Sequence, residues 1–224
     1  MKKNEPIIQR DIYLLSPLKK EDTIFLPMIT FSLLTQNIEL SKYDMLMFTS
    51  KQAVLSAESI NPLWKEIPCL AIGDATAKQI ESLGGTVYHK PKIFYAKSLS
   101  EDIIKKFKDK NIIYLRPKEV SFDSKQFLAQ ENIVLHEQII YETTCISYEK
   151  KDAPRKNAII IFTSPSTVKC FFQNFSWDKS YIAIVIGEAT KKHLPEEVCV
   201  YVSDIATIES CILKAKELLT ANRL

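Results

Sequence analysis

The chain has 224 residues, of which 46% are hydrophobic and 25% charged, a composition typical of a soluble globular protein with one or two domains. Its formal net charge of +3 is a mild excess spread along the chain, without the dense Lys/Arg runs of surfaces that bind nucleic acids or membranes. We therefore expect no nucleic-acid and no membrane partner, whereas an acidic small molecule is compatible with this charge.

Short apolar segments typical of buried strands recur along the chain, and stretches with helical spacing lie between several of them. The expected strands are 12–15, 45–48, 69–72, 112–115, 158–162 and 181–186. The expected helices are 52–60, 75–83, 99–107, 124–128 and 205–219. Continuous apolar strands that alternate with helices indicate an α/β fold whose parallel sheets are covered on both faces.

The cysteines and the N-terminus bear on the compartment of the protein. The five cysteines form an odd set without a CxxC pair, which favours neither a structural zinc site nor a fully paired disulfide framework. No apolar run approaches the ~20 residues of a membrane span, and the first residues do not resemble a signal peptide. We expect reduced thiols and a cytoplasmic protein. The cysteines are Cys69, Cys145, Cys170, Cys199 and Cys211.

An internal repeat is the most informative feature of the sequence. The letters FTS at 48–50, followed by IGDAT at 72–76, return as FTS at 162–164, followed by IGEAT at 186–190. In both copies the Thr of FTS lies 24 residues before the Gly, from 49 to 73 and from 163 to 187. Equal spacing in both copies indicates the duplication of an α/β unit.

The repeated motifs place small and hydroxyl-bearing residues at the starts of helices. Such helix starts leave backbone N–H groups free and carry a positive dipole end, which attracts carboxylates or phosphates. In open α/β sheets, ligands bind outside the carboxyl ends of the strands. Any one of these residues alone is also explained by helix capping without a ligand. The candidate binding residues are Thr49, Ser50, Gly73, Thr76, Ser164, Gly187 and Thr190.

Several other chemistries lack their motifs. The chain has only four glycines and neither a GxGxxG nor a P-loop pattern, which disfavours a nucleotide site. His89, His136 and His193 occur singly, and no Cys shares a motif with a His, so neither metal-ligand spacing nor a Cys-His nucleophile is indicated. We expect catalysis without a metal and without a cofactor.

The segments FTSKQAV, AIGDATA, IYLRP, IIYET, IIIFTSPSTVKCFF and AIVIGEATKKHL occur in this order, and the chain resembles the uroporphyrinogen-III synthase family over nearly its whole length. The resemblance implies two similar Rossmann-like α/β domains, joined by a two-stranded linker, with the active site in the interdomain cleft. One domain would combine 1–35 with 147–224, and the inserted one would be 37–140. The linkers would be about 27–36 and 140–148.

The resemblance also implies the activity. Family members close the linear tetrapyrrole hydroxymethylbilane to uroporphyrinogen III, with inversion of ring D and loss of water. They bind the carboxylates mainly through backbone amides and hydroxyls at helix starts, which agrees with the candidate residues above. Tyr141 matches the Tyr that is the usual candidate for assisting departure of the hydroxyl. A transient handover from hydroxymethylbilane synthase and a monomeric state complete this expectation.

Two alternatives stay open at this stage. The first is a non-catalytic two-domain binding module for an acidic ligand. It is favoured by Ser16-Pro17, where many relatives have Arg-Pro, and by the short spacing before Phe25, which predicts a shortened or absent first helix. The second is an α/β enzyme that uses a nucleotide or sugar phosphate, and it is weakened by the absence of a glycine-rich loop.

Overall fold

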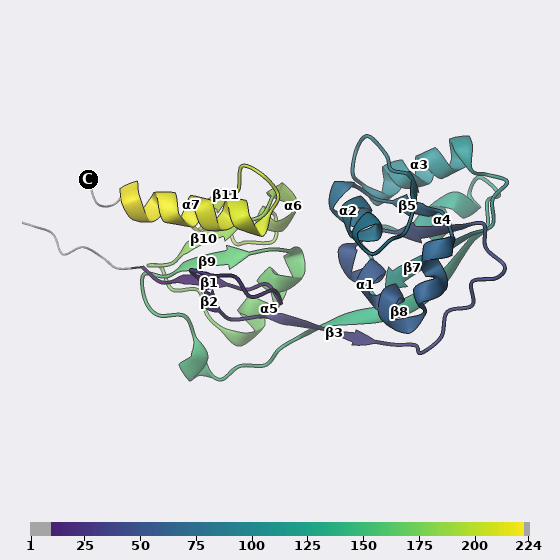
Figure 1. Cartoon of the computed structure of the whole chain (residues 1–224). Helices are drawn as coiled ribbons and strands as arrows, with labels where there is room; N and C mark the ends of the chain where they lie inside the picture. Colours follow the sequence, from purple (N-terminus) through teal and green to yellow (C-terminus); the bar gives the residue numbers. More distant parts are fainter. Residues whose placement is uncertain (1–9, 222–224) are drawn as a thin grey trace, which may run out of the picture. The chain divides into compact units, whose positions relative to one another are not determined.

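The computed structural model describes residues 10–221, which form two compact units, each with its own sheet. Unit 1 contains the chain up to Thr30 and from Thr144 onward, and unit 2 is the continuous segment Phe31–Thr143. In each unit helices cover both faces of the sheet (Figure 1). The mixed α/β fold with parallel sheets that the sequence predicts is therefore confirmed.

The larger sheet has the strand order β3-β8-β7-β4-β5-β6. Its strands are β3 (Ile29–Leu33), β4 (Met45–Phe48), β5 (Cys69–Ala71), β6 (Val87–His89), β7 (Ile112–Pro117) and β8 (Leu135–Cys145). Every pair from β8 to β6 in this order is parallel. All four residues of β4 are buried, because the strand lies inside the sheet and is covered on both faces.

Helices pack on the two faces of this sheet through separate apolar clusters. The helices α1 (Lys51–Ile60) and α2 (Asp74–Ser82) pack on one face, where Ala53 and Ile80 join a cluster with Phe48. The opposite face is covered by α3 (Ala96–Lys106) and α4 (Ser124–Ala129), as part of a cluster around Met47. Alternate residues of β4 thus serve opposite faces. The short 3-10 helix η1 (Pro62–Glu66) follows α1.

The sheet of unit 1 has the order β11-β10-β9-β1-β2, with parallel pairing throughout. Its strands are β1 (Ile12–Leu14), β2 (Ile24–Phe25), β9 (Ile159–Phe162), β10 (Ile182–Val185) and β11 (Val200–Val202). The helices are α5 (Pro165–Asn174), α6 (Glu188–Lys191) and α7 (Ile208–Ala221), with the 3-10 helix η2 (Lys150–Asp152). Helix α7 packs on the face that carries Ile159, Ile161 and Ile184. Figure 1 shows α5 on the other face of this sheet.

The two copies of the repeat occupy the same place in their sheets. In each unit the FTS strand, β4 or β9, pairs in parallel with the IG strand that follows it, β5 or β10. The backbone N–H of Ile72 donates to the carbonyl of Phe48 at 3.0 Å, and that of Ile186 donates to the carbonyl of Phe162 at 3.1 Å. The FTS and IG segments therefore emerge side by side at the carboxyl edge of each sheet.

Each predicted strand and helix overlaps an observed element, and the ends differ by a few residues. Between β1 and β2 the chain forms bends and turns and no helix, as the short spacing predicts. Ile24 and Phe25 of the edge strand β2 are 41% and 39% exposed. The short edge strands β2, β6 and β11 were not predicted, because two or three half-exposed residues carry too little periodicity to be recognised.

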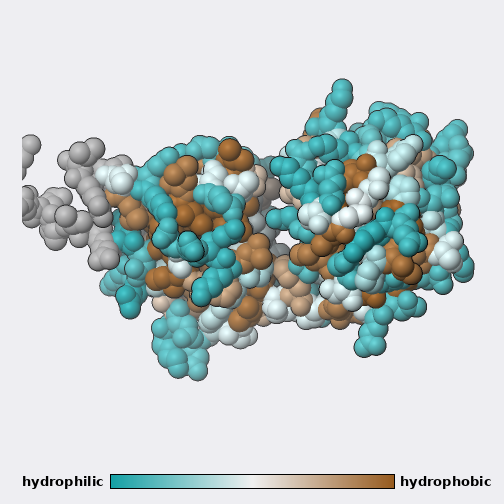
Figure 2. Space-filling model, in the orientation of Figure 1, coloured by the Kyte–Doolittle hydropathy of each residue, from teal (hydrophilic) through white to brown (hydrophobic). Residues whose placement is uncertain are grey.

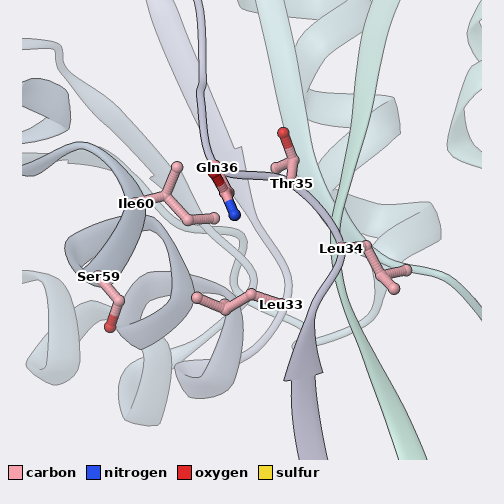
Figure 3. Close-up of a pocket in the computed structure, with 6 residues that line it drawn as sticks. All are labelled: Leu33, Leu34, Thr35, Gln36, Ser59 and Ile60. Atoms are coloured by element: carbon pink, nitrogen blue, oxygen red, sulfur yellow. The ribbon is translucent and has the colours of Figure 1, made fainter.

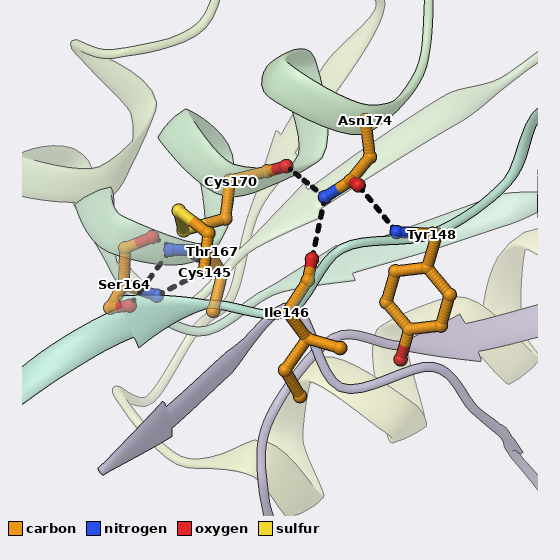
Figure 4. Close-up of a disulfide and its surroundings, with 7 residues drawn as sticks. All are labelled: Cys145, Ile146, Tyr148, Ser164, Thr167, Cys170 and Asn174. Atoms are coloured by element: carbon orange, nitrogen blue, oxygen red, sulfur yellow. Dashed lines mark hydrogen bonds between the residues drawn. A yellow bond between two sulfur atoms is a disulfide. The ribbon is translucent and has the colours of Figure 1, made fainter. Parts of the chain in front are cut away.

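One expectation about the cysteines is wrong. Cys145, at the end of β8, is bonded to Cys170 on α5, with their Cα atoms 5.2 Å apart (Figure 4). Cys69, Cys199 and Cys211 are free thiols. The sequence does not show this pairing because the two positions are separated by 25 residues and meet only when α5 packs beside the end of β8. Not all five cysteines are therefore reduced thiols.

Figure 2 shows hydrophilic residues over much of the visible face of each unit, with apolar residues between them. Within residues 10–221, no helix has the length and hydrophobicity needed to cross a membrane.

Candidate functional site

Thr49 and Ser50 follow the buried strand β4 directly and lead into α1. Ser50 is the N-cap residue of α1, and its Oγ accepts a hydrogen bond from the backbone N–H of Ala53 at 3.0 Å. Extended backbone at the cap and a hydroxyl acceptor are what a helix start requires. Both hydroxyls therefore lie at the carboxyl edge of the sheet, next to the start of a helix of ten residues.

Each of these two hydroxyls bonds a tyrosine from the two strands on the other side of β4. The Oγ1 of Thr49 lies 2.6 Å from the Oη of Tyr114 on β7. The Oγ of Ser50 lies 2.9 Å from the Oη of Tyr141 on β8. The sequence makes Ser50 a candidate binding residue and Tyr141 a candidate catalytic residue, and the structure brings the two into hydrogen-bond contact.

Tyr141 is held in a largely apolar environment. It is 4% exposed, and its ring meets that of Phe31 edge to face, with centroids 5.9 Å apart. Burial raises the pKa of Tyr141, and the hydrogen bond to Ser50 opposes this effect. The phenol therefore stays protonated at neutral pH and can act as a hydrogen-bond donor.

Tyr114 and Arg116 on β7 were not among the site residues expected from the sequence. Tyr114 is 2% exposed, and burial raises the pKa of its phenol to about 12. The Nε of Arg116 lies 3.3 Å from a carboxylate oxygen of Glu137, and its guanidinium donates to the carbonyl of Lys118. The sequence signal that could have identified Tyr114 is a phenol within an apolar run, since a buried Tyr hydroxyl usually needs a polar partner.

The second helix start of unit 2 is covered by a nearby loop. Gly73 is the N-cap residue of α2, and a Cβ at this position would lie 2.8 Å from the Cγ of Phe94. Lys90 forms an ion pair with Asp74, the first residue of α2. The side chain of Thr76 is only 3% exposed. In this structure the loop therefore occupies the space beside Gly73.

In unit 1 the backbone N–H groups at the FTS helix start already donate to side chains of the same segment. Ser164 is the N-cap residue of α5 and accepts from the backbone N–H of Thr167 at 3.2 Å. The Oγ1 of Thr167 accepts in turn from the backbone N–H groups of Thr163 and Ser164, each at 3.2 Å. Unit 2 has Ala53 where unit 1 has Thr167, so this reciprocal cap belongs to one copy only.

The IG helix start of unit 1 is open. A Cβ at Gly187 would meet no atom within 4 Å. Thr190 is 2% exposed, as buried as Thr76 in the other copy. Both threonines therefore face the interior of their units, whereas the space beside the N-cap glycine is free at Gly187 and filled at Gly73.

A pocket of about 480 Å³ in unit 2 lies away from these helix starts. Its lining residues are Leu33, Leu34, Thr35, Gln36, Ser59 and Ile60 (Figure 3). Ser59 and Ile60 end α1, whereas Ser50 starts it, and ten helical residues span about 15 Å. This lining has no charged group, so the pocket is a poor match for a polyanion.

Two units, each with a parallel sheet and with hydroxyl-bearing helix starts at the carboxyl edge of that sheet, define an open-sheet α/β protein, a class whose members bind ligands at this edge. A family model described as uroporphyrinogen-III synthase HemD matches residues 19–212. The chain therefore belongs to the uroporphyrinogen-III synthase family, and it is a cyclising lyase of tetrapyrrole synthesis.

Solved structures show the same fold. The chain is 24% identical to the uroporphyrinogen-III synthetase of Helicobacter pylori 26695, with a TM-score of 0.77, over 94% of this chain and 100% of that one. A mutant uroporphyrinogen III synthase of the extremely thermophilic bacterium Thermus thermophilus is 10% identical, with a TM-score of 0.60, over 95% and 100% of the two chains. A comparison with curated protein sequences gave no match.

Proposed function

We propose that this chain closes hydroxymethylbilane to uroporphyrinogen III, with inversion of ring D and loss of water, and that Tyr141 and Ser50 assist departure of the hydroxyl group. The hydrogen bond between Ser50 and Tyr141 is the observation that carries this assignment. It joins a helix-start hydroxyl to a phenol whose pKa is raised by burial, so that the phenol stays neutral. A neutral phenol can donate to a leaving oxygen without any other acid.

The Oγ of Ser50 accepts from the backbone N–H of Ala53, and either hydroxyl can donate in the pair with Tyr141. For the substrate-bound state we assign the arrangement in which Ser50 donates to the Oη of Tyr141, because the leaving hydroxyl then offers the phenol hydrogen an acceptor. The phenol hydrogen of Tyr141 is then free for the hydroxyl of the substrate. Ser50 thereby orients Tyr141 as a donor.

In the reaction, the electron pair of the terminal pyrrole nitrogen expels the hydroxyl, which gains a proton and leaves as water, while the pyrrole N–H loses a proton and an azafulvene results. Attack by the substituted carbon of ring D on the exocyclic carbon of the azafulvene forms a spiro intermediate. The bond from that ring D carbon to its original bridging methylene then breaks and re-forms at the other α-carbon of ring D, which loses its proton to give the inverted macrocycle. The substrate supplies the reactive groups, so the protein mainly holds a flexible chain in the reactive conformation. Such positioning can lower a barrier by several kcal/mol, about 7–11 in the best intramolecular cases.

The carboxylates of the substrate are assigned to the helix starts of both units. Thr49 and Gly73 with Thr76 are assigned to this role in unit 2, where the loop that carries Phe94 must move away from Gly73. Ser164 and Gly187 with Thr190 are assigned to it in unit 1. Because Thr76 and Thr190 are buried, their contribution is to shape the first helical turn. The strand order β11-β10-β9-β1-β2 of unit 1 corresponds to the order β6-β5-β4-β7-β8 in unit 2, which supports an origin of the units by duplication. We place the domains at 1–35 plus 147–224 and at 37–140, and the linkers at about 27–36 and 140–148. A handover from hydroxymethylbilane synthase and a cytoplasmic location complete the proposal; the location rests on the family, since the disulfide between Cys145 and Cys170 removes the argument from reduced cysteines.

The activity is tested by adding freshly generated hydroxymethylbilane, oxidising the products and separating the type I and type III porphyrin isomers. We expect type III in excess over the enzyme-free control. Folded protein that yields only type I would leave the non-catalytic binding module as the function.

The role of Tyr141 is tested with Tyr141→Phe, which removes the hydroxyl and keeps the ring. We expect kcat to fall about a hundredfold, the lower range for loss of a positioned acid. The variant should still melt cooperatively, since loss of one hydrogen bond costs only about 1 kcal/mol. Tyr181→Phe is the control, because Tyr181 is equally buried, at 5% exposed, and bonds the carbonyl of Pro154 in unit 1. Wild-type kcat in Tyr141→Phe would disprove the assignment.

A further inference from the structure

The hydroxyls of Thr49 and Tyr114 form a hydrogen-bonded pair, in which Tyr114 is the more deeply buried residue. Tyr114 is the register partner of Met47 on β4, two residues before Thr49, and its ring belongs to the apolar cluster with Met47, Leu99 and Leu128. Among residues 10–221, the hydrogen-bond partner of this phenol is Thr49, at 2.6 Å. Arg116, Glu137 and Tyr141 act on the phenol electrostatically, without a hydrogen bond to its hydroxyl among the described residues.

The direction of this hydrogen bond follows from burial. If Thr49 donated, the phenol hydrogen of Tyr114 would be left in the core without an acceptor, which costs about 1–3 kcal/mol. Thr49 is only partly buried, so its own hydrogen can reach a group outside the core. Tyr114 therefore donates and Thr49 accepts, which leaves the hydrogen of Thr49 directed away from Tyr114.

We propose that Tyr114 is a positioning residue that holds the Thr49 hydroxyl as a hydrogen-bond donor to a carboxylate of the substrate. Without the phenol, the Thr49 hydroxyl is free to rotate and to turn its oxygen toward the carboxylate, which offers only acceptors. With it, the donor is oriented before binding, and the bond from Tyr114 strengthens the next one in the chain. This inference rests on the proposed role of Thr49 as a binding residue.

The other copy of the repeat has no tyrosine at the position of Tyr114. When the segment IYLLSP is aligned with IYLRP by its final proline, Leu14 takes the place of Tyr114, and Leu14 is fully buried. Thr163, the counterpart of Thr49, has no phenol at that position. We therefore place an oriented threonine donor in unit 2 alone, on the same strand end as the Ser50–Tyr141 pair.

The test is a double-mutant cycle with Thr49→Val and Tyr114→Phe, in which KM, kcat and the type III to type I ratio are measured for hydroxymethylbilane. We expect Thr49→Val to raise KM about tenfold and Tyr114→Phe about threefold to fivefold, the scale of one hydrogen bond to a charged group. The double variant should stay near tenfold, because both changes remove the same donor. Tyr181→Phe, the matched buried tyrosine, should leave KM unchanged.

Unfolding by urea supplies a second readout. Thr49→Val leaves the phenol hydrogen of Tyr114 without an acceptor and should destabilise the protein more than Tyr114→Phe does. Adding Tyr114→Phe to Thr49→Val should restore part of the stability, since both polar partners are then gone. If Tyr114→Phe destabilises more than Thr49→Val, Tyr114 is not the donor and the inference is wrong.

The outcomes separate this inference from the proposed function. Wild-type KM in Thr49→Val would refute Thr49 as a binding residue, and the inference with it. A raised KM in Thr49→Val but not in Tyr114→Phe, or multiplied effects in the double variant, would refute the inference alone. Should Tyr114→Phe not fold, p-aminophenylalanine at position 114 keeps a donor and should keep KM within about twofold; a tenfold loss would overturn the inference.

Discussion

Gly73 and Gly187 occupy equivalent positions in the two copies, yet their surroundings differ. Both are N-cap residues with extended backbone, at φ −179° and 177°, a conformation open to any residue. The difference lies in space, because the Cβ of an Ala would lie 2.8 Å from the Cγ and 3.0 Å from the Cβ of Phe94 at Gly73, and would meet nothing within 4 Å at Gly187.

Gly73→Ala should therefore destabilise the protein by about 1 kcal/mol more than Gly187→Ala, the lower range for overpacking. Both variants lose the same preference for Gly over Ala at an N-cap, so Gly187→Ala is the matched control. Urea unfolding measures the difference, and Phe94→Ala in the same chain should abolish it. Equal losses in the two single variants would show that the loop moves aside without cost.

At the scale of elements, strand β8 and helix α5 are joined by covalent and hydrogen bonds. Besides the disulfide between Cys145 and Cys170, Asn174 on α5 donates to the carbonyl of Ile146 at 2.8 Å and accepts from the backbone N–H of Tyr148 at 2.7 Å (Figure 4). The loop that the disulfide closes contains the strand β9 and Ser164. These bonds hold α5, and with it the FTS helix start of unit 1, against the end of β8.

Replacing Cys145 and Cys170 by Ser should lower the free energy of unfolding by about 3 kcal/mol, given the 25-residue separation. Urea unfolding in oxidising buffer measures this loss. Reduction of the wild-type protein by dithiothreitol should give a similar loss, and the double Ser variant should lose nothing further. Cys199→Ser, at an exposed free thiol, is the control. Equal stability of the oxidised and reduced wild-type protein would contradict the prediction.

At the scale of the whole molecule, the two units differ in how the chain builds them. Unit 2 is the continuous segment Phe31–Thr143, with both of its apolar clusters drawn mainly from within it. Unit 1 is discontinuous, and its strand β1 lies between β9 and β2 in the sheet. Ile12 and Leu14 of β1 are part of the cluster under α7. One unit has a local core, and the other needs both ends of the chain.

A fragment of residues 31–143 should therefore unfold in a single cooperative transition, followed by circular dichroism on heating. A fragment of residues 144–224 lacks β1 and should show no such transition. The edge of β9 that pairs with β1 would be left without a partner, and the apolar cluster under α7 would lose Ile12 and Leu14. Adding a peptide of residues 1–30 should restore cooperativity. A cooperative transition in the second fragment alone would show that β1 is dispensable for this core.

Much of the architecture is local in the sequence. The apolar runs at 45–48 and 159–162 indicate buried strands, because four residues are too few for a helix and hydroxyl residues that can cap a following helix come directly after them. Ser50 and Ser164 start helices because their hydroxyls bond the residue three positions later. The repeat spacing located the helix starts, since strand, turn and helix lengths are set within each copy.

What the sequence by itself determined is the class of fold, the places of the helix starts and the family. The tertiary structure alone decided which groups meet across long separations: Thr49 with Tyr114, 65 residues apart, and Ser50 with Tyr141, 91 residues apart. It also decided the bond between Cys145 and Cys170 and the cover of Gly73 by Phe94. Local propensity acts over a few residues, whereas these contacts depend on strand order and register, which arise only when the sheet is assembled.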